Sequence, residues 1–436
     1  MYIKRAIDKE LLKWKDSLNR KPLLLRGARQ VGKTETVRNL GRYFEYFLEV
    51  NFESDKEIHS IFKGNLSPSE ICENLSAVYN VPVKEGKTLL FFDEIQECIG
   101  ALQSLRFFYE KMPQLHLITA GSLVEFIFSE VPSFGVGRIR SAFMYPLSFN
   151  EFLLAFGENN LVNIKQKAFS HKPLTETVHN KLLEYLRKFL ILGGMPEVIL
   201  NYLRTKDLSE SRQIISDLLI GYYDDFAKYK KRVSADYLRE VFNAVVMQTG
   251  NKFVYSKVNI HGGYKKVKEV LELLVLSGLV IPVEHTSANG LPLGAEVNLR
   301  KRKMFVFDTG LFLHILGLNI SDILLAKDFT IINKGVLAEM FAGLELVKYQ
   351  SPYQKAELYY WHREAKNSNA EVDYLISKGN NIIPIEIKAG TKGTMRSLTL
   401  FMKEKHISKG IRISMENFSR YGKVDVYPLY AIDLLK

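Results

Sequence analysis

Apolar residues in the first third of the chain fall into short runs, which are separated by stretches with helical spacing. The runs lie near residues 22–26, 46–52, 88–93 and 115–119, and residues 100–112 form one of the helical stretches. Strands that alternate with helices are typical of a parallel sheet wrapped by helices. A continuous apolar run such as 88–93 suits a strand buried on both faces. Residues 1–150 are therefore predicted to form an α/β domain.

Helical spacing dominates after residue 150. Residues 181–192 and 208–229 favour helices, and Gly193-Gly-Met-Pro196 breaks the chain between them. We expect residues 151–232 to be a helical lid or linker region.

The next part of the chain has the pattern of three helices followed by a hairpin. Asn289-Gly290 is a strong turn signal between apolar segments. The expected helices are 235–250, 255–260 and 264–277, and the expected strands are 279–285, 295–299 and 303–307. This order predicts a winged helix over residues 233–325, whose usual use is insertion of one helix into a DNA groove. The alternative is a winged helix that contacts only other proteins.

Residues 326–436 are predicted to form a separate α/β unit. Residues 334–348 have helical spacing, and strands are expected at 356–362, 370–377 and 382–389, with a turn at 378–381. These elements bring several charged residues onto neighbouring strands.

Four of those charged residues form a candidate metal site. Glu386 and Lys388 are two apart on one strand, so they face the same side, and Asp373 lies one hairpin earlier. Such a set can hold one or two Mg²⁺ ions, while Lys388 positions or helps to deprotonate a water molecule. Glu339 on the preceding helix would complete the shell. The alternative is that these charges alternate on a solvated strand face.

Residues 27–34 fit the phosphate-loop pattern G-x-x-x-x-G-K-[ST] without a mismatch, between an apolar run and a helical stretch. Glycines at both ends let backbone N–H groups turn towards phosphate oxygens, and the following helix adds its dipole. Lys33 would reach the β- and γ-phosphates of ATP, and the Thr34 hydroxyl would bind Mg²⁺. The alternative is a glycine-rich turn before a helix. The predicted nucleotide-binding residues are Gly27, Ala28, Arg29, Gln30, Val31, Gly32, Lys33 and Thr34.

Polar residues after the next two strands complete this candidate site. Asp93 ends the run at 88–93, where it can hold Mg²⁺ through water, and Glu94 could polarise the attacking water. Ser122 follows the run at 115–119 and could contact the γ-phosphate, with Thr119 as the alternative. Arg138, in a loop rich in Gly, Pro and Ser, could stabilise charge during phosphoryl transfer, or it could be a solvated loop residue.

Composition indicates a folded protein of two or three domains. The chain has 436 residues, of which 47% are hydrophobic and 25% charged. Its two cysteines are too few for a disulfide framework or a zinc site, which suggests a reducing compartment. The first residues lack the apolar core of a signal peptide, and no run approaches the ~20 apolar residues of a membrane span. We therefore expect a cytoplasmic protein without membrane contact.

The net charge of +12 favours a polyanionic partner. Basic residues concentrate in two short runs, 228–232 and 300–303. Lys265, Lys266 and Lys268 also open the expected recognition helix of the winged helix. Clustered positive charge of this kind fits contact with the phosphates of DNA, although each run could be a solvated face.

The chain resembles, over nearly its whole length, a prokaryotic family of AAA-like P-loop ATPases with a C-terminal domain of unknown function. The resemblance rests on the phosphate loop and Phe91–Gln96, Thr119–Ser122, Gly137-Arg138, Pro146–Phe152, Gly193–Glu197, Phe307–Leu311 and the Asp373, Glu386 and Lys388 set. That last set is similar to the PD-(D/E)XK nuclease-like fold. One departure is Glu35, where many relatives have a second Thr. The resemblance implies ATP binding.

Three functional hypotheses follow. The first is a DNA-associated ATPase with a Mg²⁺-dependent nuclease or a DNA clamp at its C-terminal end; if Arg138 acts in trans, a homo-oligomer is required. The second is a nucleotide-gated signalling or scaffold protein with a catalytically silent C-terminal binding module. The third is a phosphotransferase, for which no acceptor motif is found.

Overall fold

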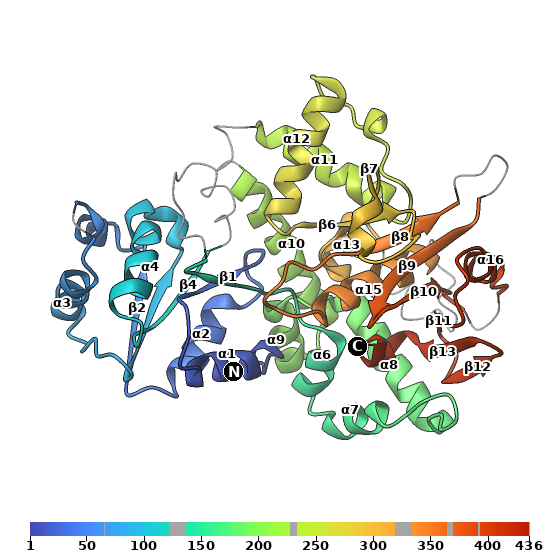
Figure 1. The fold of residues 1–436 in the computed structure, drawn as a ribbon, viewed down its shortest axis with the longest axis horizontal. Helices are drawn as coiled ribbons and strands as arrows, with labels where there is room; N and C mark the ends of the chain where they lie inside the picture. Colours follow the sequence, from blue (N-terminus) through green and yellow to red (C-terminus); the bar gives the residue numbers. More distant parts are fainter. Residues whose placement is uncertain are drawn as a thin grey trace. The chain divides into compact units, whose positions relative to one another are not determined.

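The computed structural model describes residues 1–64, 66–121, 137–226, 233–318, 334–363, 369–390 and 393–435. The chain divides into two compact units (Figure 1). Unit 1 consists of Met1–Tyr145 with the short segments Leu276–Gly278 and Ser351–Lys355. Unit 2 consists of Pro146–Val275, Leu279–Gln350 and Ala356–Lys436.

Unit 1 is built on a five-stranded sheet with the order β2-β3-β4-β1-β5. Its strands are β1 (Leu23–Arg26), β2 (Tyr46–Asn51), β3 (Thr88–Asp93), β4 (His116–Ala120) and β5 (Arg140–Phe143). All neighbouring strands are parallel, which confirms the predicted parallel sheet. The strand β5 was not predicted. In this order β1 lies beside β4 rather than β2, and such a reversal of strand order is where open α/β sheets bind ligands.

Both faces of this sheet are covered. The helices of unit 1 are α1 (Ile7–Asp16), α2 (Lys33–Gly41), α3 (Pro68–Tyr79) and α4 (Ile99–Lys111), with a 3₁₀ segment η1 (Lys56–Phe62). Every residue of β3 is buried, as predicted from its unbroken apolar run. Phe91 stacks with Phe47 on one face, with ring centroids 6.4 Å apart, while Phe92 packs on the other.

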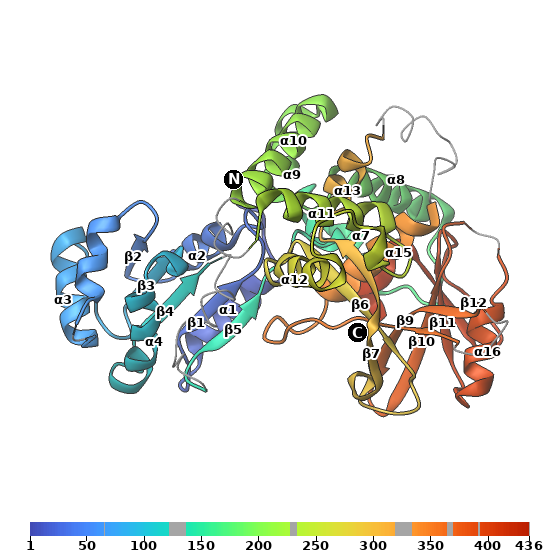
Figure 2. The same ribbon diagram turned by 90° about the horizontal axis from the view of Figure 1, so that it is seen from above.

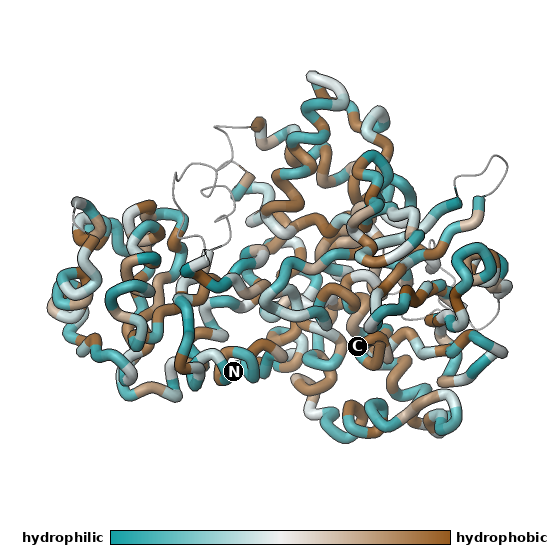
Figure 3. Tube along the Cα trace, viewed as in Figure 1, coloured by the Kyte–Doolittle hydropathy of each residue, from teal (hydrophilic) through white to brown (hydrophobic). Residues whose placement is uncertain are grey.

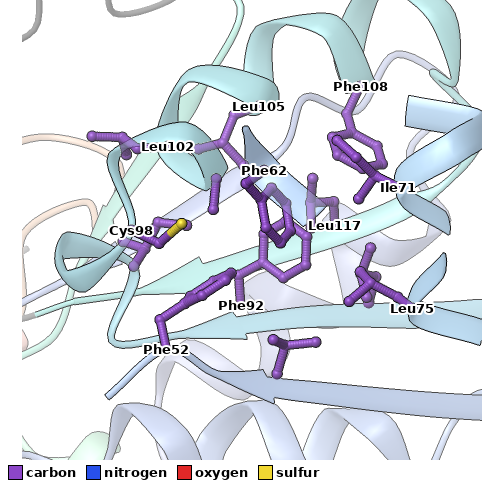
Figure 4. Packing of buried hydrophobic residues seen from close by; sticks show 14 of the residues in the cluster. Phe52, Phe62, Ile71, Leu75, Phe92, Cys98, Leu102, Leu105, Phe108 and Leu117 are labelled. Atoms are coloured by element: carbon purple, nitrogen blue, oxygen red, sulfur yellow. The ribbon is translucent and has the colours of Figure 1, made fainter. Parts of the chain in front are cut away.

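A cluster of phenylalanine side chains fills the core beneath α3, α4 and η1 (Figure 4). The ring of Phe92 lies 5.5 Å from both Phe52 and Phe62 and 6.1 Å from Phe108, in edge-to-face contacts. Such contacts add to the free energy gained from apolar burial. The rings come from β3, from the end of β2, from η1 and from α4, so Phe92 joins four parts of unit 1.

Unit 2 contains an eight-stranded mixed sheet with the order β12-β13-β11-β10-β9-β8-β6-β7 (Figure 2). The strands are β6 (Val280–Thr286), β7 (Val297–Val306), β8 (Tyr359–His362), β9 (Glu371–Lys378), β10 (Asn381–Ile387), β11 (Gly410–Ser414), β12 (Ser419–Tyr421) and β13 (Val424–Pro428). The two strands expected at 295–299 and 303–307 are one strand, β7. The pair β6 and β8 is parallel, with Glu284 opposite Tyr359. The hairpin of the predicted winged helix and the strands after residue 326 therefore belong to one sheet.

Helices form the rest of unit 2. They are α6 (Phe149–Ala155), α7 (Asn159–Gln166), α8 (Glu176–Leu192), α9 (Pro196–Thr205), α10 (Leu208–Asp225), α11 (Ala235–Gln248), α12 (Gly263–Leu276), α13 (Thr309–Ile315), α15 (Lys334–Lys348) and α16 (Arg396–Glu404). Of the three helices expected between 235 and 277, the middle one is a short 3₁₀ turn, η4 (Tyr255–Lys257). None of the helices in the described ranges has the length and apolarity that crossing a membrane requires, and hydrophobic and hydrophilic residues alternate along them (Figure 3).

Three of the sequence motifs meet inside unit 2. The backbone N–H of Gly194 donates to Asp308 Oδ2 at 2.6 Å, and the N–H of Leu311 donates to Asp308 Oδ1 at 3.1 Å. The N–H of Leu147 donates to the Gly194 carbonyl at 2.7 Å. A Cβ atom added to Gly194 would lie 2.5 Å from the Leu147 carbonyl oxygen, so only glycine fits. The buried carboxylate of Asp308 thus joins the segments 193–197 and 307–311, and a backbone hydrogen bond to Gly194 adds the segment 146–152.

Replacing Phe92 by Ala should lower the free energy of unfolding of unit 1 by about 3–5 kcal/mol, because it removes a ring that four elements share. Trp14 lies in unit 1 and Trp361 in unit 2, so a Trp361→Phe background makes Trp14 fluorescence in urea a reporter of unit 1. The control Val78→Ala, at a position 60% exposed on α3, should change the value by less than about 0.5 kcal/mol. Equal losses for the two variants would contradict the assigned core.

Candidate functional site

The loop between β1 and α2 has a backbone that demands glycine at two positions. Gly27 has φ 147° and Gly32, which precedes α2, has φ 96°. A Cβ atom added to Gly27 would lie 2.2 Å from the carbonyl oxygen of Met144. The glycines of the predicted phosphate loop therefore let the chain turn tightly against the segment that follows β5. Gln30, at φ 61°, is a further left-handed residue of the loop.

Arg5 forms hydrogen bonds that hold this loop in place. It was not among the residues predicted from the sequence. One guanidinium nitrogen of Arg5 donates to the Val31 carbonyl at 2.7 Å, and the other donates to the Tyr145 carbonyl at 2.6 Å. The side chain thus ties the loop to the chain beyond β5. No local motif signals this role, because the two acceptors are backbone atoms far from Arg5 in sequence.

The ammonium group of Lys33 lies over the loop. It donates to the carbonyl oxygens of Gly27 at 2.9 Å and of Ala28 at 2.8 Å. Burial lowers the pKa of Lys33 to about 8, although Glu94 and Asp93 act in the opposite direction. The ammonium is therefore still charged at neutral pH, and among the described residues its hydrogen-bond acceptors are these two neutral carbonyl groups.

Thr34 and Asp93 are brought together by the sheet. The Thr34 hydroxyl donates to Asp93 Oδ2 at 2.8 Å, and the backbone N–H of Glu94 donates to Asp93 Oδ1 at 3.0 Å. Asp93 is only 4% exposed, and burial raises the pKa of its carboxyl group despite these hydrogen bonds. A hydroxyl and a carboxylate side by side are hard oxygen donors of the kind that Mg²⁺ prefers, so these two residues fit the ion.

Glu94 has a strained backbone and a side-chain partner. Its φ is 49°, in the left-handed region that few residues other than glycine adopt. The side-chain amide of Gln96 donates to Glu94 Oε2 at 2.5 Å. Gln96 was not among the predicted site residues, although it lies only two positions after Glu94. Its amide holds the carboxylate that was assigned to water activation.

The remaining predicted residues of unit 1 have different surroundings. Ser122 lies outside the described residues. Thr119 is in β4, next to β1 and β3, and its buried hydroxyl has no hydrogen-bond partner within the described ranges. Arg138 is exposed, and its Nε atom lies 2.5 Å from Glu110 Oε1 on α4. Glu35, which follows Thr34, is paired with Arg38 at 2.7 Å.

The three residues predicted to hold metal in unit 2 lie on α15, β9 and β10, and Lys388, predicted to position water, follows β10 directly; together they fall into two sets. Asp373 Oδ2 accepts a hydrogen bond from the N–H of Ile387 at 2.7 Å. Glu386 Oε1 pairs with Lys388 Nζ at 2.6 Å, while Glu386 Oε2 is buried with no partner in the described part of the chain. One oxygen from each of Glu339, Glu371 and Asp373 lies within 4.8 Å of the others. We call these three residues the acidic cluster.

Glu371 was missed by the sequence analysis. It precedes Asp373 by two positions on β9, so the strand period already places both side chains on one face. Burial raises the pKa of Glu339 to about 8 and that of Asp373 to about 6, although a neighbouring lysine acts against both shifts.

That lysine is Lys303, from β7. Its Nζ atom lies 2.7 Å from Glu339 Oε1 and also pairs with Glu371. The side chain is 1% exposed. Burial acts to lower the pKa of Lys303, but the carboxylates outweigh it and raise the pKa above the usual range.

The expectation that residues 300–303 contact DNA phosphates, or else form a solvated face, therefore does not hold for two of its members. Lys303 is buried in the acidic cluster. Arg302 pairs with Glu272 at 2.6 Å and with Glu284 at 3.0 Å. Arg300 is exposed, and the other basic run, 228–232, lies outside the described residues. The run lies on β7, the edge strand of the sheet beside β6, where Lys303 and Arg302 turn towards neighbouring acidic residues.

The acidic cluster does not fit a divalent metal ion as it stands. Carboxylate oxygens are suitable ligands for Mg²⁺. However, the ammonium group of Lys303 already contacts two of the three carboxylates, and it would repel a cation placed among them. No catalytic step through a metal ion is therefore assigned to unit 2.

Family models match three consecutive parts of the chain. Residues 19–153 match an AAA domain, residues 183–322 a domain of unknown function (DUF8612), and residues 334–432 another domain of unknown function (DUF4143). The uncharacterized protein MJ1544 of Methanocaldococcus jannaschii is 25% identical over 236 residues, which are 53% of this chain. The chain matches 48% of that relative's length.

Solved structures show weaker likenesses. The Orc1 protein of Aeropyrum pernix, in complex with DNA, has a TM-score of 0.31 and 13% identity, with 74% of this chain and 95% of that chain covered. A signal transduction ATPase with numerous domains, PH0952 of Pyrococcus horikoshii, has a TM-score of 0.30 and 11% identity, with 81% and 46% covered. Unliganded Pif1 from a Bacteroides species has a TM-score of 0.23 and 15% identity, with 38% and 46% covered. At these scores the likenesses carry no argument about function.

The family match and the loop geometry agree on the N-terminal part of the chain. The matched residues 19–153 include the loop after β1, the strand-borne Asp93 and all five parallel strands. The PD-(D/E)XK assignment of the C-terminal part stays a prediction, since the matched model there carries no function. Residues 19–153 are an AAA-type domain of the P-loop ATPase class.

Proposed function

We propose that unit 1 binds ATP together with Mg²⁺ and hydrolyses it. The observation that carries the proposal is the contact between Thr34 and Asp93, whose side-chain oxygens are 2.8 Å apart. Thr34 directly follows Lys33 and the glycine loop in the sequence. Residues 59 positions apart in sequence are brought into contact at the carboxyl edge of a parallel sheet, where such folds bind nucleotides.

The residues of the loop have distinct tasks in this proposal. Backbone N–H groups of residues 27–32 and the N-terminus of α2 surround the phosphates. Lys33 exchanges its two carbonyl acceptors for oxygens of the β- and γ-phosphates. This exchange replaces neutral acceptors by charged ones, which form stronger hydrogen bonds with an ammonium group. Mg²⁺, held by Thr34 and by Asp93, supplies neutralisation of the phosphate charge.

Glu94 is the proposed group that polarises the attacking water. In the structure Glu94 Oε2 accepts a hydrogen bond from Gln96, which orients the carboxylate and leaves further acceptor positions for a water molecule. The amide of Gln96 also keeps Glu94 from being an unpaired acceptor beside Lys33 and Asp93. Ser122 or Thr119 near the γ-phosphate, and Arg138 in cis or from a second copy of the chain, remain proposals of this site.

Replacement of Lys33 by Ala should abolish the positive charge that meets the phosphates. We expect ATP turnover to fall by about 10²–10³-fold, as for removal of one preorganised electrostatic contact at an active site. Phosphate release measured at saturating ATP and Mg²⁺ provides the value. The control is Lys13→Ala, an exposed lysine of α1 that pairs with Glu10 on its own helix. Turnover in Lys33→Ala equal to that of the wild type would overturn the site.

Replacement of Gly27 by Ala should impair binding rather than chemistry. The added Cβ atom meets the Met144 carbonyl, so the loop must shift away from its phosphate-binding shape. Calorimetric titration with ATP and Mg²⁺ should show at least about tenfold weaker binding, which corresponds to 1.4 kcal/mol. Gly221→Ala is the control, because a Cβ atom at that position of α10 meets nothing within 4 Å. Unchanged affinity in Gly27→Ala would show that this loop does not hold the nucleotide.

We further propose that the protein associates with DNA. Support comes from the net charge of +12 and from Lys265 and Lys268, which are exposed on α12, with Arg300 exposed on β7. The lysine within the acidic cluster argues for a C-terminal part that clamps nucleic acid rather than one that cuts it. The same lysine also favours the second candidate, a nucleotide-gated signalling or scaffold protein whose C-terminal module is catalytically silent.

Salt dependence separates these two candidates. If Lys265 and Lys268 contact phosphates, their joint replacement by Ala should reduce the slope of log K against log[salt] by about 1.8, or 0.9 for each contact. Fluorescence anisotropy with a labelled DNA duplex measures the slope. Lys409→Ala, at an exposed position between α16 and β11, is the control and should leave the slope unchanged. Binding that does not respond to salt would favour the scaffold.

A further inference from the structure

The acidic cluster is assembled by two elements, and a third delivers a positive charge into it. Glu339 comes from α15, and Glu371 and Asp373 come from β9. Lys303 reaches the cluster from β7, which is at the far side of β8 and β6 in the sheet order. The contact therefore exists only when the hairpin of β6 and β7 is joined to the strands that follow residue 356.

Strand pairing and a neighbouring aromatic ring hold the side chain of Lys303 in its position. Its backbone is paired with Val283 in β6 and forms an isolated bridge with Lys252. Its Nζ atom lies 5.1 Å from the centre of the Tyr360 ring, which adds a cation–π contact. The side chain is 1% exposed. The ammonium group cannot withdraw to water while β7 stays in the sheet.

Further hydrogen bonds hold the Asp373 carboxylate and the backbone of Glu339. Asp373 accepts from the N–H of Ile387, and the hydroxyl of Tyr374 donates to the backbone carbonyl of Glu339 at 2.7 Å. Glu386, 4% exposed on the neighbouring strand, has one buried oxygen with no partner in the described part of the chain. Negative charge thus exceeds positive charge in this region. The chain supplies two cations to this region: Lys388 pairs with Glu386, and Lys303 is the cation that reaches Glu339 and Glu371.

We propose that Lys303 is the resident cation of the acidic cluster and takes the place that a divalent metal ion would otherwise occupy. Unit 2 then carries the carboxylates of a metal site without binding the metal. Loss of the ammonium group would leave Glu339, Glu371 and Asp373 within 4.8 Å of one another with an uncompensated charge, which is a site for a hard divalent or trivalent cation. The proposal concerns unit 2 and does not depend on ATP binding by unit 1.

The test compares metal binding by the wild type and by Lys303→Met, which keeps the length of the side chain and removes its charge. Terbium is a suitable probe, because Tyr360 and Tyr374 are close enough to the cluster to sensitise its luminescence. Both proteins carry Asp93→Asn, which removes the carboxylate of the nucleotide site. We expect saturable luminescence in Lys303→Met, with a dissociation constant on the order of 10⁻⁴–10⁻³ M as in weak oxygen-ligand sites, and none in the wild type.

Two controls assign the signal. Addition of Asp373→Asn to Lys303→Met should abolish it, because one of the three carboxylates is lost. Arg302→Met removes a neighbouring cation of the same strand, which pairs with Glu272 and Glu284 instead, and should create no signal. Mn²⁺ binding, followed by the loss of the free-ion electron paramagnetic resonance signal, should give the same order of affinities.

The outcomes that overturn the proposal are distinct from those that overturn ATP binding. Saturable terbium or Mn²⁺ binding by the wild type that is lost with Asp373→Asn would show that the cluster takes a metal beside Lys303. A folded Lys303→Met protein, checked by circular dichroism, that binds no metal would show that Lys303 does not exclude one. If Lys303→Met does not fold, Lys303→Gln replaces it, and the wild-type measurement decides in any case. Mg²⁺-dependent cleavage of plasmid DNA that requires Asp373 would also overturn the proposal.

Discussion

Both units of this protein are organised around a buried ammonium group, and the acceptors of that group decide what it can do. Lys33 is hydrogen-bonded to two backbone carbonyls, at 2.9 and 2.8 Å, and burial lowers its pKa to about 8. Lys303 is bonded to carboxylates, which raise its pKa. Neutral acceptors are readily exchanged for the charged oxygens of a phosphate, whereas a carboxylate cannot be given up in a buried place without a large penalty. The first lysine is therefore available for a ligand, and the second is locked.

The two lysines also depend on different parts of the structure. The site of Lys33 depends on the backbone conformation of its loop, whereas the position of Lys303 depends on the pairing of strands in the sheet. The loop before Lys33 must keep its carbonyls and N–H groups in place, and it does so through Gly27 against Met144 and Arg5 against Val31. Lys303 needs no special loop. It needs β7 to pair with β6, β6 with β8 and β8 with β9, because only this chain of pairings brings its side chain to Glu339 and Glu371.

This difference sets how much the sequence could predict. The parallel sheet and the phosphate loop depend on local patterns, namely apolar runs and glycines at fixed spacing, and the predicted fold class is confirmed. The strand β5 was missed because residues rich in Gly, Pro and Ser precede it, and Arg5 because its acceptors are backbone atoms. The burial of Lys303 could not be predicted from the sequence, because Lys303 and Glu371 are 68 positions apart. Without knowledge of the strand pairing, a run of basic residues is expected to be exposed to solvent. Glu371 alone could have been found, from its two-residue spacing to Asp373.

The ion pairs of Lys303 also change which part of unit 2 is expected to contact a partner. A cluster whose cation comes from its own chain offers no open coordination position, so activity of unit 2 would have to lie in its surface. Exposed basic side chains of unit 2 lie on α12 and on β7. Lys303 and Arg302 attach these same elements to the rest of the unit through their ion pairs. Arg302 bonds to Glu272 of α12 itself. The ion pairs of Lys303 and Arg302 therefore connect β7 with α15, β9 and α12, and β7 and α12 carry these exposed basic side chains.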